Sequence, residues 1–115
     1  MRALSALVLA LSLLSCRPRP ALTLLPHHLP DAESGQPYRA TITVRGNETP
    51  VGGIGVAEGR LPAGLTMASE RGDSAATISG TPTETGSFVF TVEAWCLGTN
   101  RSGQTGRQSD TLVVK

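Results

Sequence analysis

Hydrophobic and polar residues alternate along several stretches of this chain, most clearly between Phe88 and Ala94. Successive side chains of a β-strand point to opposite faces, so a period of two is typical of a strand with one buried face. The predicted buried face contains every second residue of the stretch, namely Phe88, Phe90, Val92 and Ala94. The opposite face contains Val89, Thr91 and Glu93. The pattern therefore predicts a long, half-buried strand.

Weaker patterns predict further strands. The next clearest alternation places four residues on a core face, namely Tyr38, Ala40, Ile42 and Val44. The other expected strands cover residues 22–25, 51–58, 66–67, 75–78 and 110–114. Strand 51–58 has the least support, because its glycines lose backbone entropy on folding and offer no side chain to pack. Residues 98–106 are expected to form a flexible loop.

Turn residues separate these strands, and they are frequent in a chain with 13 Gly and 8 Pro. The segments LPAGL at 61–65 and SGTP at 79–82 both combine Pro and Gly in a way that favours chain reversal. A length of 115 residues suits one small domain, and no convincing helical pattern follows residue 15. Short strands joined by turns predict an all-β fold, a single β-sandwich.

The amino terminus has the plan of a signal peptide. Arg2 precedes an uncharged run from Ala3 to Leu14, and a segment of Arg and Pro follows Cys16. As a helix that rises about 1.5 Å per residue, the run would reach roughly 18 Å, well short of a ~30 Å hydrocarbon core. We therefore predict a cleaved signal at residues 1–15 rather than a permanent transmembrane anchor.

The residues before Cys16, Leu13 and the small Ser15, resemble the lipobox of bacterial lipoproteins. The resemblance implies cleavage just before Cys16 and acylation of its thiol and of the new amino terminus, so that several acyl chains give stable anchoring. Arg17 implies, by the same resemblance, sorting to the outer membrane. The alternative is an ordinary secretory signal with a chance cysteine. The expected organisation is a signal peptide at 1–15, the lipidated Cys16 with a short tether at 16–21, and one domain at 22–115.

The order of GQPY, LPAGL, ISGTP and TGSFVFTVEA resembles the immunoglobulin-like family of bacterial surface and secreted proteins, and is similar to dystroglycan-type cadherin-like domains. The resemblance covers residues 21–115 and implies an immunoglobulin-like β-sandwich. Cadherin-like relatives often carry an Asp after the long strand, a candidate calcium ligand, whereas this chain has Trp95 and Cys96 there.

Charge and motifs exclude several function classes. Loss of residues 1–15 leaves nine Lys+Arg against nine Asp+Glu, so no basic field for nucleic acid exists. The acidic residues stand singly and are expected to be solvated surface charges, not a calcium cluster: Asp31, Glu33, Asp73, Glu84, Glu93 and Asp110. Adjacent His27 and His28 would point to opposite sides of an extended segment and cannot share a metal ion. No nucleophile elbow or phosphate loop occurs, so we expect no enzyme, no metal and no cofactor.

Two residues at the end of the long strand are candidates for function. Trp95 is expected on the outward face, either as a binding anchor for a sugar ring or a partner protein, or as a cover for a sheet edge or the following loop. Cys96 is expected to be a free thiol once Cys16 is acylated. It would then either continue the buried face as a small apolar residue or form an intermolecular disulfide.

These observations predict a non-catalytic, lipid-anchored protein of the bacterial cell envelope. Its immunoglobulin-like domain would bind an unidentified protein or glycan. The alternative is a structural or assembly subunit of an envelope complex, which offers an edge strand to a partner. In both cases the membrane is contacted through the lipid anchor, and no nucleic acid is bound.

Overall fold

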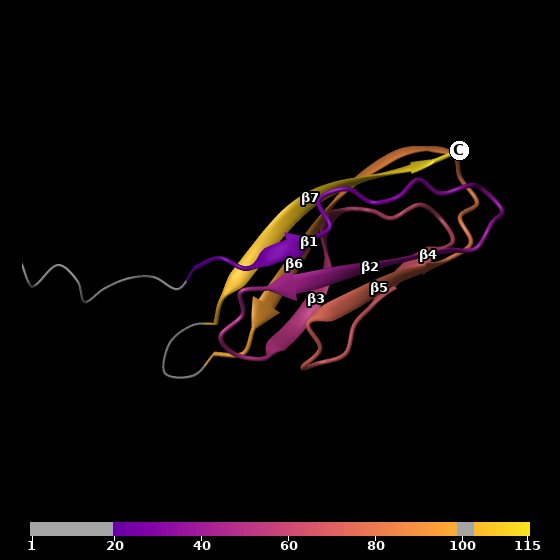
Figure 1. The fold of residues 1–115 in the computed structure, drawn as a ribbon. Coiled ribbons are helices and arrows are strands. Elements are labelled where there is room, and N and C mark those ends of the chain that lie inside the picture. The colour runs from indigo at the N-terminus through magenta and orange to yellow at the C-terminus, as the bar shows by residue number, and fades with distance from the viewer. Residues whose placement is uncertain (1–19, 99–102) are drawn as a thin grey trace, which may run out of the picture.

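The structure is a computed structural model that describes residues 20–98 and 103–115 (Figure 1). The described residues form seven β-strands, which are β1 (Thr23–Leu25), β2 (Tyr38–Arg45), β3 (Val51–Gly59), β4 (Leu65–Ala68), β5 (Ala75–Gly80), β6 (Gly86–Cys96) and β7 (Thr105–Val114). The predicted signal peptide, Cys16 and most of the tether lie outside the described residues. Within the described part of the chain, no helix is long and apolar enough to span a bilayer.

The strands form two antiparallel sheets. The larger sheet has the order β1-β2-β5-β4, and the smaller sheet has the order β3-β6-β7. The two sheets lie face to face in Figure 1. The predicted all-β sandwich is therefore confirmed.

The inward faces of both sheets form one hydrophobic core. In β6 the predicted alternation is confirmed, because Phe90, Val92 and Ala94 are buried and Val89 is 59% exposed. The larger sheet contributes the predicted Ile42 and Val44 of β2 and Ile78 of β5, all buried. Leu112 of β7 is also buried and belongs to the smaller sheet. A period of two in the sequence thus determined which side chains meet between the sheets.

The first segment of the domain contacts both sheets. Its residues 23–25 form β1, which pairs with β2. The chain then crosses to the smaller sheet, where Ala32 forms a parallel bridge with Val114. The Ala32 N–H donates to Val113 O at 2.8 Å, and the Lys115 N–H donates to Ala32 O at 2.9 Å. Buried Leu29 lies between the two contacts in sequence. The edge of β7 is thereby covered along part of its length, which limits its pairing with other chains.

The closing strand is longer than predicted. It begins at Thr105 rather than Asp110, so the prediction of a loop at 98–106 is wrong for its last two residues. Gly106 allows β7 to begin this early beside the first segment of the domain, because a Cβ at this position would lie 2.7 Å from the carbonyl oxygen of Leu22. Only a residue without a side chain permits this close approach. Residues 99–102 of the expected loop lie outside the described residues.

Gln104, in the same predicted loop, is a buried hydrogen-bonding centre. Its side-chain amide donates to Pro20 O at 2.9 Å and to Gly46 O at 3.0 Å, and its Oε1 accepts from the Glu48 N–H at 2.7 Å. Its own carbonyl accepts from the Cys96 N–H at 2.8 Å. The amide side chain therefore joins the start of the domain to the β2–β3 turn, and the backbone carbonyl of the same residue pairs with β6. The sequence does not indicate this role, because the side-chain partners of Gln104 are more than 50 residues away in the chain.

Asp110 is not the solvated surface charge that the sequence suggested. It pairs with Phe90 across β6 and β7, shares the inward face and is 2% exposed. Its Oδ1 accepts from Gln108 Nε2 at 3.0 Å, and its Oδ2 has no hydrogen-bond partner in the described residues. Burial raises the pKa of Asp110, against smaller opposing effects of the Gln108 hydrogen bond and of His27 and His28. An inward-pointing charge on an edge strand is a known device against edge-to-edge pairing.

Asp110→Asn is expected to stabilise the protein at neutral pH. A carboxyl whose pKa is raised by folding favours the native state while it is protonated, and this contribution is lost as pH rises through the folded pKa. The stability advantage of the variant should therefore be largest near pH 7. It should decrease at pH values below about 4, where Asp110 is protonated in the unfolded chain too. Urea unfolding at a series of pH values measures it. An equal difference between variant and wild type at all pH values would contradict the assignment.

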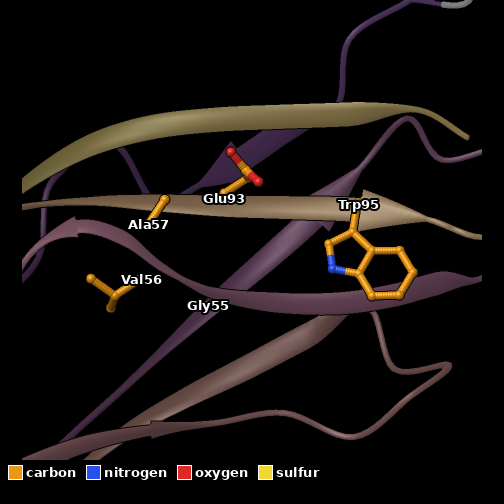
Figure 2. Close-up of a pocket in the computed structure, with 5 residues that line it drawn as sticks. All are labelled: Gly55, Val56, Ala57, Glu93 and Trp95. Carbon is orange, nitrogen blue, oxygen red and sulfur yellow. The ribbon is translucent and has the colours of Figure 1, made fainter.

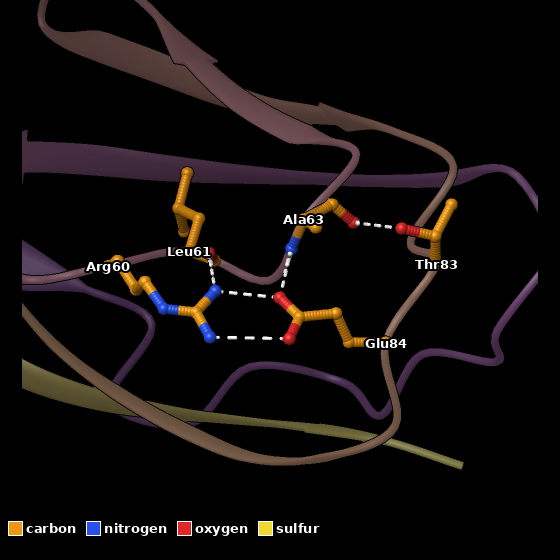
Figure 3. Close-up of polar contacts among 5 residues, drawn as sticks. All are labelled: Arg60, Leu61, Ala63, Thr83 and Glu84. Atoms are coloured by element: carbon orange, nitrogen blue, oxygen red, sulfur yellow. Dashed lines mark hydrogen bonds and ion pairs between the residues drawn. The ribbon is translucent and has the colours of Figure 1, made fainter.

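Glu84 makes polar contacts with Arg60, just after β3, and with Ala63, just before β4 (Figure 3). Its carboxylate accepts from Arg60 Nη1 at 2.6 Å, from Arg60 Nη2 at 3.2 Å and from the Ala63 N–H at 2.9 Å. These hydrogen bonds, the one from Arg60 first, lower the pKa of Glu84 to about 2. Arg60 also lies 5.4 Å from the centroid of the Phe88 ring. The LPAGL and SGTP turns, distant in sequence, are thus joined by one exposed carboxylate.

Candidate functional site: the Trp95 face

Trp95 lies on the outward face of the smaller sheet. It occupies the penultimate position of β6, between buried Ala94 and buried Cys96, and is 44% exposed. Alternation along an extended strand is sufficient to place it there. The structure therefore places Trp95 on the face that the sequence predicted.

The indole ring of Trp95 covers the backbone of the neighbouring strand β3. Gly53 is its cross-strand partner. A Cβ built on Gly52 would overlap the indole, and one built on Gly53 would lie 2.9 Å from the indole Nε1. Any larger residue at Gly52 would displace the ring.

Strand 51–58, which had the least support from the sequence, is thus present as β3. The packing of Trp95 explains why this strand contains glycines. The ring of Trp95 supplies the packing that Gly52 and Gly53 lack, as an aromatic residue does across from a strand glycine in other sheets. The register shift between Val51 and Gly53 brings both glycines beneath one ring. Trp95 therefore covers a sheet edge and is also exposed, so the two interpretations of this residue are compatible.

A shallow hollow of ≈ 160 Å³ adjoins the ring and is lined by Gly55, Val56, Ala57, Glu93 and Trp95 (Figure 2). A Cβ built on Gly55 would meet nothing within 4 Å, so the space above this residue is open. Figure 2 shows the indole beside β3 and the Glu93 carboxylate two residues back on β6. A planar ligand that stacks on the indole would have room to extend over Gly55.

Charged groups follow the ring along the sheet. Arg107 of β7 is the cross-strand partner of Glu93, and its Nε lies 3.1 Å from a carboxylate oxygen of Glu93. Arg107 Nη2 also lies 3.3 Å from a carboxylate oxygen of Glu58 on β3. These exposed ion pairs contribute little to stability. They do place the Glu93 carboxylate and the Arg107 guanidinium beside the exposed aromatic ring, with Glu58 further along the sheet.

The arrangement combines an apolar surface with hydrogen-bond acceptors. The indole offers a flat apolar surface, and the carboxylates accept hydrogen bonds that hydroxyl groups donate. Within the described residues, no group of three or more His, Cys, Asp and Glu residues is placed to hold a metal ion. His27 and His28 are exposed, and His27 Nδ1 lies 3.0 Å from Gln108 Oε1.

Cys96 lies behind Trp95 on the inward face. It is 4% exposed and is a free cysteine within the described part of the chain. In this position it continues the apolar face of β6, which agrees with the interpretation of Cys96 as a small buried apolar residue. An intermolecular disulfide would require local opening of the sheet to expose the thiol.

A comparison with protein families decides the class of the domain. The family model described as "Putative Ig domain" matches residues 20–115. The chain belongs to this Ig domain family. The expected immunoglobulin-like sandwich is thus confirmed, and its matched region contains every strand described above. No curated protein matches the chain.

A solved structure shares the Ig-like fold. The chain is similar to the ASH / PapD-like domain of human CEP192, PapD-like domain 7, with 12% sequence identity and a TM-score of 0.57. The similarity covers 100% of this chain and 97% of that one. At this identity the similarity shows the fold of the Ig domain and not its ligand. Ig-like and PapD-like domains are generally non-enzymatic interaction domains.

Proposed function

We propose that this Ig domain is a non-catalytic binding module of the bacterial cell envelope, anchored by acyl chains on Cys16, and that its Trp95 face binds the partner. One observation carries the proposal: an exposed indole rests on a glycine surface beside the Glu93–Arg107 pair. An aromatic side chain that already has a fixed position loses little conformational entropy on binding. Solvent-exposed tryptophans are also frequent energetic centres of interfaces.

A glycan is the partner that fits this face best. The apolar face of a sugar ring stacks on an indole, and the ring hydroxyls donate to a neighbouring carboxylate such as that of Glu93. The open space above Gly55 allows a second ring to follow the first. A protein partner would need a larger apolar contact, whereas the hollow beside Trp95 holds only ≈ 160 Å³.

Trp95→Ala is expected to weaken glycan binding by about thirtyfold, because loss of a central aromatic contact costs about 2 kcal/mol and every 1.4 kcal/mol is tenfold. The protein is titrated calorimetrically with cellotetraose, maltotetraose, xylotetraose and chitotetraose. Trp95→Phe, which keeps a ring, should retain part of the affinity. Val89→Ala, on the same face of β6, should retain all of it. Equal binding by Trp95→Ala and wild type, or no binding of any of the four sugars, would contradict the glycan proposal.

The anchor and the location in the outer membrane belong to the same proposal. They are supported by the lipobox-like residues Leu13, Ser15 and Cys16 and by Arg17 after them. Mass measurement of the mature amino-terminal peptide tests the anchor directly. An unmodified Cys16 thiol would contradict lipidation and would leave the Trp95 proposal intact.

The edge of β3 supports a second candidate, an assembly subunit. Near its start, β3 is covered by the β4–β5 hairpin, whose Gly72 N–H donates to Val51 O at 2.7 Å and whose Ser69 hydroxyl donates to Ile54 O at 3.2 Å. Residues 56–59 are exposed at the edge of the sheet and could receive a partner strand. After delipidation, a binding module should be monomeric, whereas a subunit should co-purify with constant partners.

A further inference from the structure

The larger sheet has a hollow of its own on its outward face, with a volume of ≈ 530 Å³. Its floor is the outward row of β5, which consists of Ala75, Thr77 and Ser79. The hollow lies on the other sheet from Trp95, so the two surfaces are separate.

Small side chains in the middle of the sheet create this hollow. β5 is an interior strand between β2 and β4, and its outward residues are only half-buried because their short side chains leave space above them. Ala68, the cross-strand neighbour of Thr77 on β4, is equally short. The hairpin that joins β4 to β5 closes one end of the hollow with Glu70 and Asp73. The floor therefore presents the hydroxyls of Thr77 and Ser79 to a ligand.

Opposite charges lie at the two ends of this floor. Arg39 of β2 is the cross-strand partner of Ser79, at one end, and the two carboxylates lie beyond Ala75 at the other. At about 3.3 Å per residue, the distance along β5 from Ser79 to Ala75 is roughly 13 Å. Within the described residues, Arg39, Glu70 and Asp73 form no ion pair. The hollow thus has an uncompensated positive end and an uncompensated negative end.

We propose that this hollow binds a short extended peptide segment of about five residues, with a basic group at the Glu70–Asp73 end and a carboxylate at Arg39. In an extended chain the first and fifth residues point to the same face and lie about 13 Å apart, which matches the separation of the charged ends. The hydroxyls of Thr77 and Ser79 can bond the peptide's N–H and C=O groups. A neutral glycan could use these hydroxyls too, but it would cover three charged groups without a counter-charge, at a cost in desolvation.

Saturation-transfer NMR on the purified full chain tests the proposal with the peptide acetyl-Lys-Ser-Thr-Ser-Glu-amide. The peptide should bind, and the neutral acetyl-Gln-Ser-Thr-Ser-Gln-amide should bind about five- to thirtyfold more weakly, since it lacks two exposed ion pairs that contribute about 0.5–1 kcal/mol each. The double variant Glu70→Gln/Asp73→Asn and the variant Arg39→Gln should each reduce the affinity for the charged peptide to a similar extent. Raised salt should weaken its binding.

Control variants separate this site from the Trp95 face. Glu33→Gln removes an exposed carboxylate that does not line the hollow and should leave peptide binding unchanged. Trp95→Ala should also leave it unchanged, so this proposal and the glycan proposal can fail separately. The proposal is overturned if the charged peptide does not bind at millimolar concentration, if the neutral peptide binds equally well, or if maltotetraose displaces the charged peptide from the wild type.

Discussion

Phe90→Ala is expected to lower the free energy of unfolding by about 3–5 kcal/mol, the largest effect of any side-chain truncation that we predict. Phe90 is 1% exposed and is the largest fully buried side chain. Its removal leaves a cavity between the two sheets, because Val92 and Leu112 cannot collapse into the space without moving their strands. Urea unfolding followed by circular dichroism measures the change as a lower midpoint.

The matched control is Val89→Ala, one residue earlier on the same strand. Val89 is 59% exposed on the outward face, so its truncation should change stability by less than about 0.5 kcal/mol. Because the two residues are adjacent, the contrast tests which face of β6 is buried. Similar losses for both variants would show that the face assignment is wrong.

Gly64→Ala is expected to cost about 3–5 kcal/mol, although it adds a single methyl group. Gly64, in the LPAGL turn, has φ of +95°, a conformation that L side chains rarely adopt. A Cβ at this position would also overlap the carbonyl oxygen of Thr81 in the SGTP turn. Neither turn can move away freely, because Thr83 N–H donates to Ala63 O at 2.9 Å. Thermal or urea unfolding of the variant measures the loss.

Gly72→Ala provides the control for the backbone conformation. Gly72 has the same φ of +95°, but a Cβ there would meet nothing within 4 Å. Its substitution should therefore cost only the conformational strain, about 1–2 kcal/mol. The difference between the two variants measures the close approach of the two turns. Equal losses would mean that the LPAGL and SGTP backbones are not in contact.

The core of the fold could be predicted from the sequence because it depends on a local signal. The period of two along β2 and β6 identified Ile42, Val44, Phe90 and Val92 as inward residues, and all are buried. The turns were equally local, since Pro and Gly mark chain reversal by their own backbone preferences. The outward position of Trp95 followed from the same alternation.

Residues whose role depends on a distant strand could not be predicted in this way. Gly52 and Gly53 weakened the expectation of a strand because the ring that covers them is more than 40 residues later in the chain. Asp110 was interpreted as a surface charge because only its pairing with Phe90 reveals that it points inward. Gln104 had no distinguishing neighbours in sequence. In all three cases the missing information is the register between strands.

The hollow on the larger sheet has the same explanation. Arg39 and Ser79 are paired only once β2 and β5 are aligned, and Asp73 approaches the floor only through the hairpin between β4 and β5. In the sequence these residues are ordinary strand and turn residues. Their charges become informative because, within the described residues, they have no ion-pair partner and lie at opposite ends of one surface.

Tryptophan fluorescence tests the central claim most directly, because Trp95 is the one tryptophan of the chain. The emission of the wild-type protein is recorded while the best-binding tetrasaccharide is added. We expect a saturable change in emission whose midpoint equals the calorimetric dissociation constant, because the bound sugar covers the indole. Saturation of the calorimetric signal with no change in Trp95 emission would place the sugar elsewhere and contradict the claim.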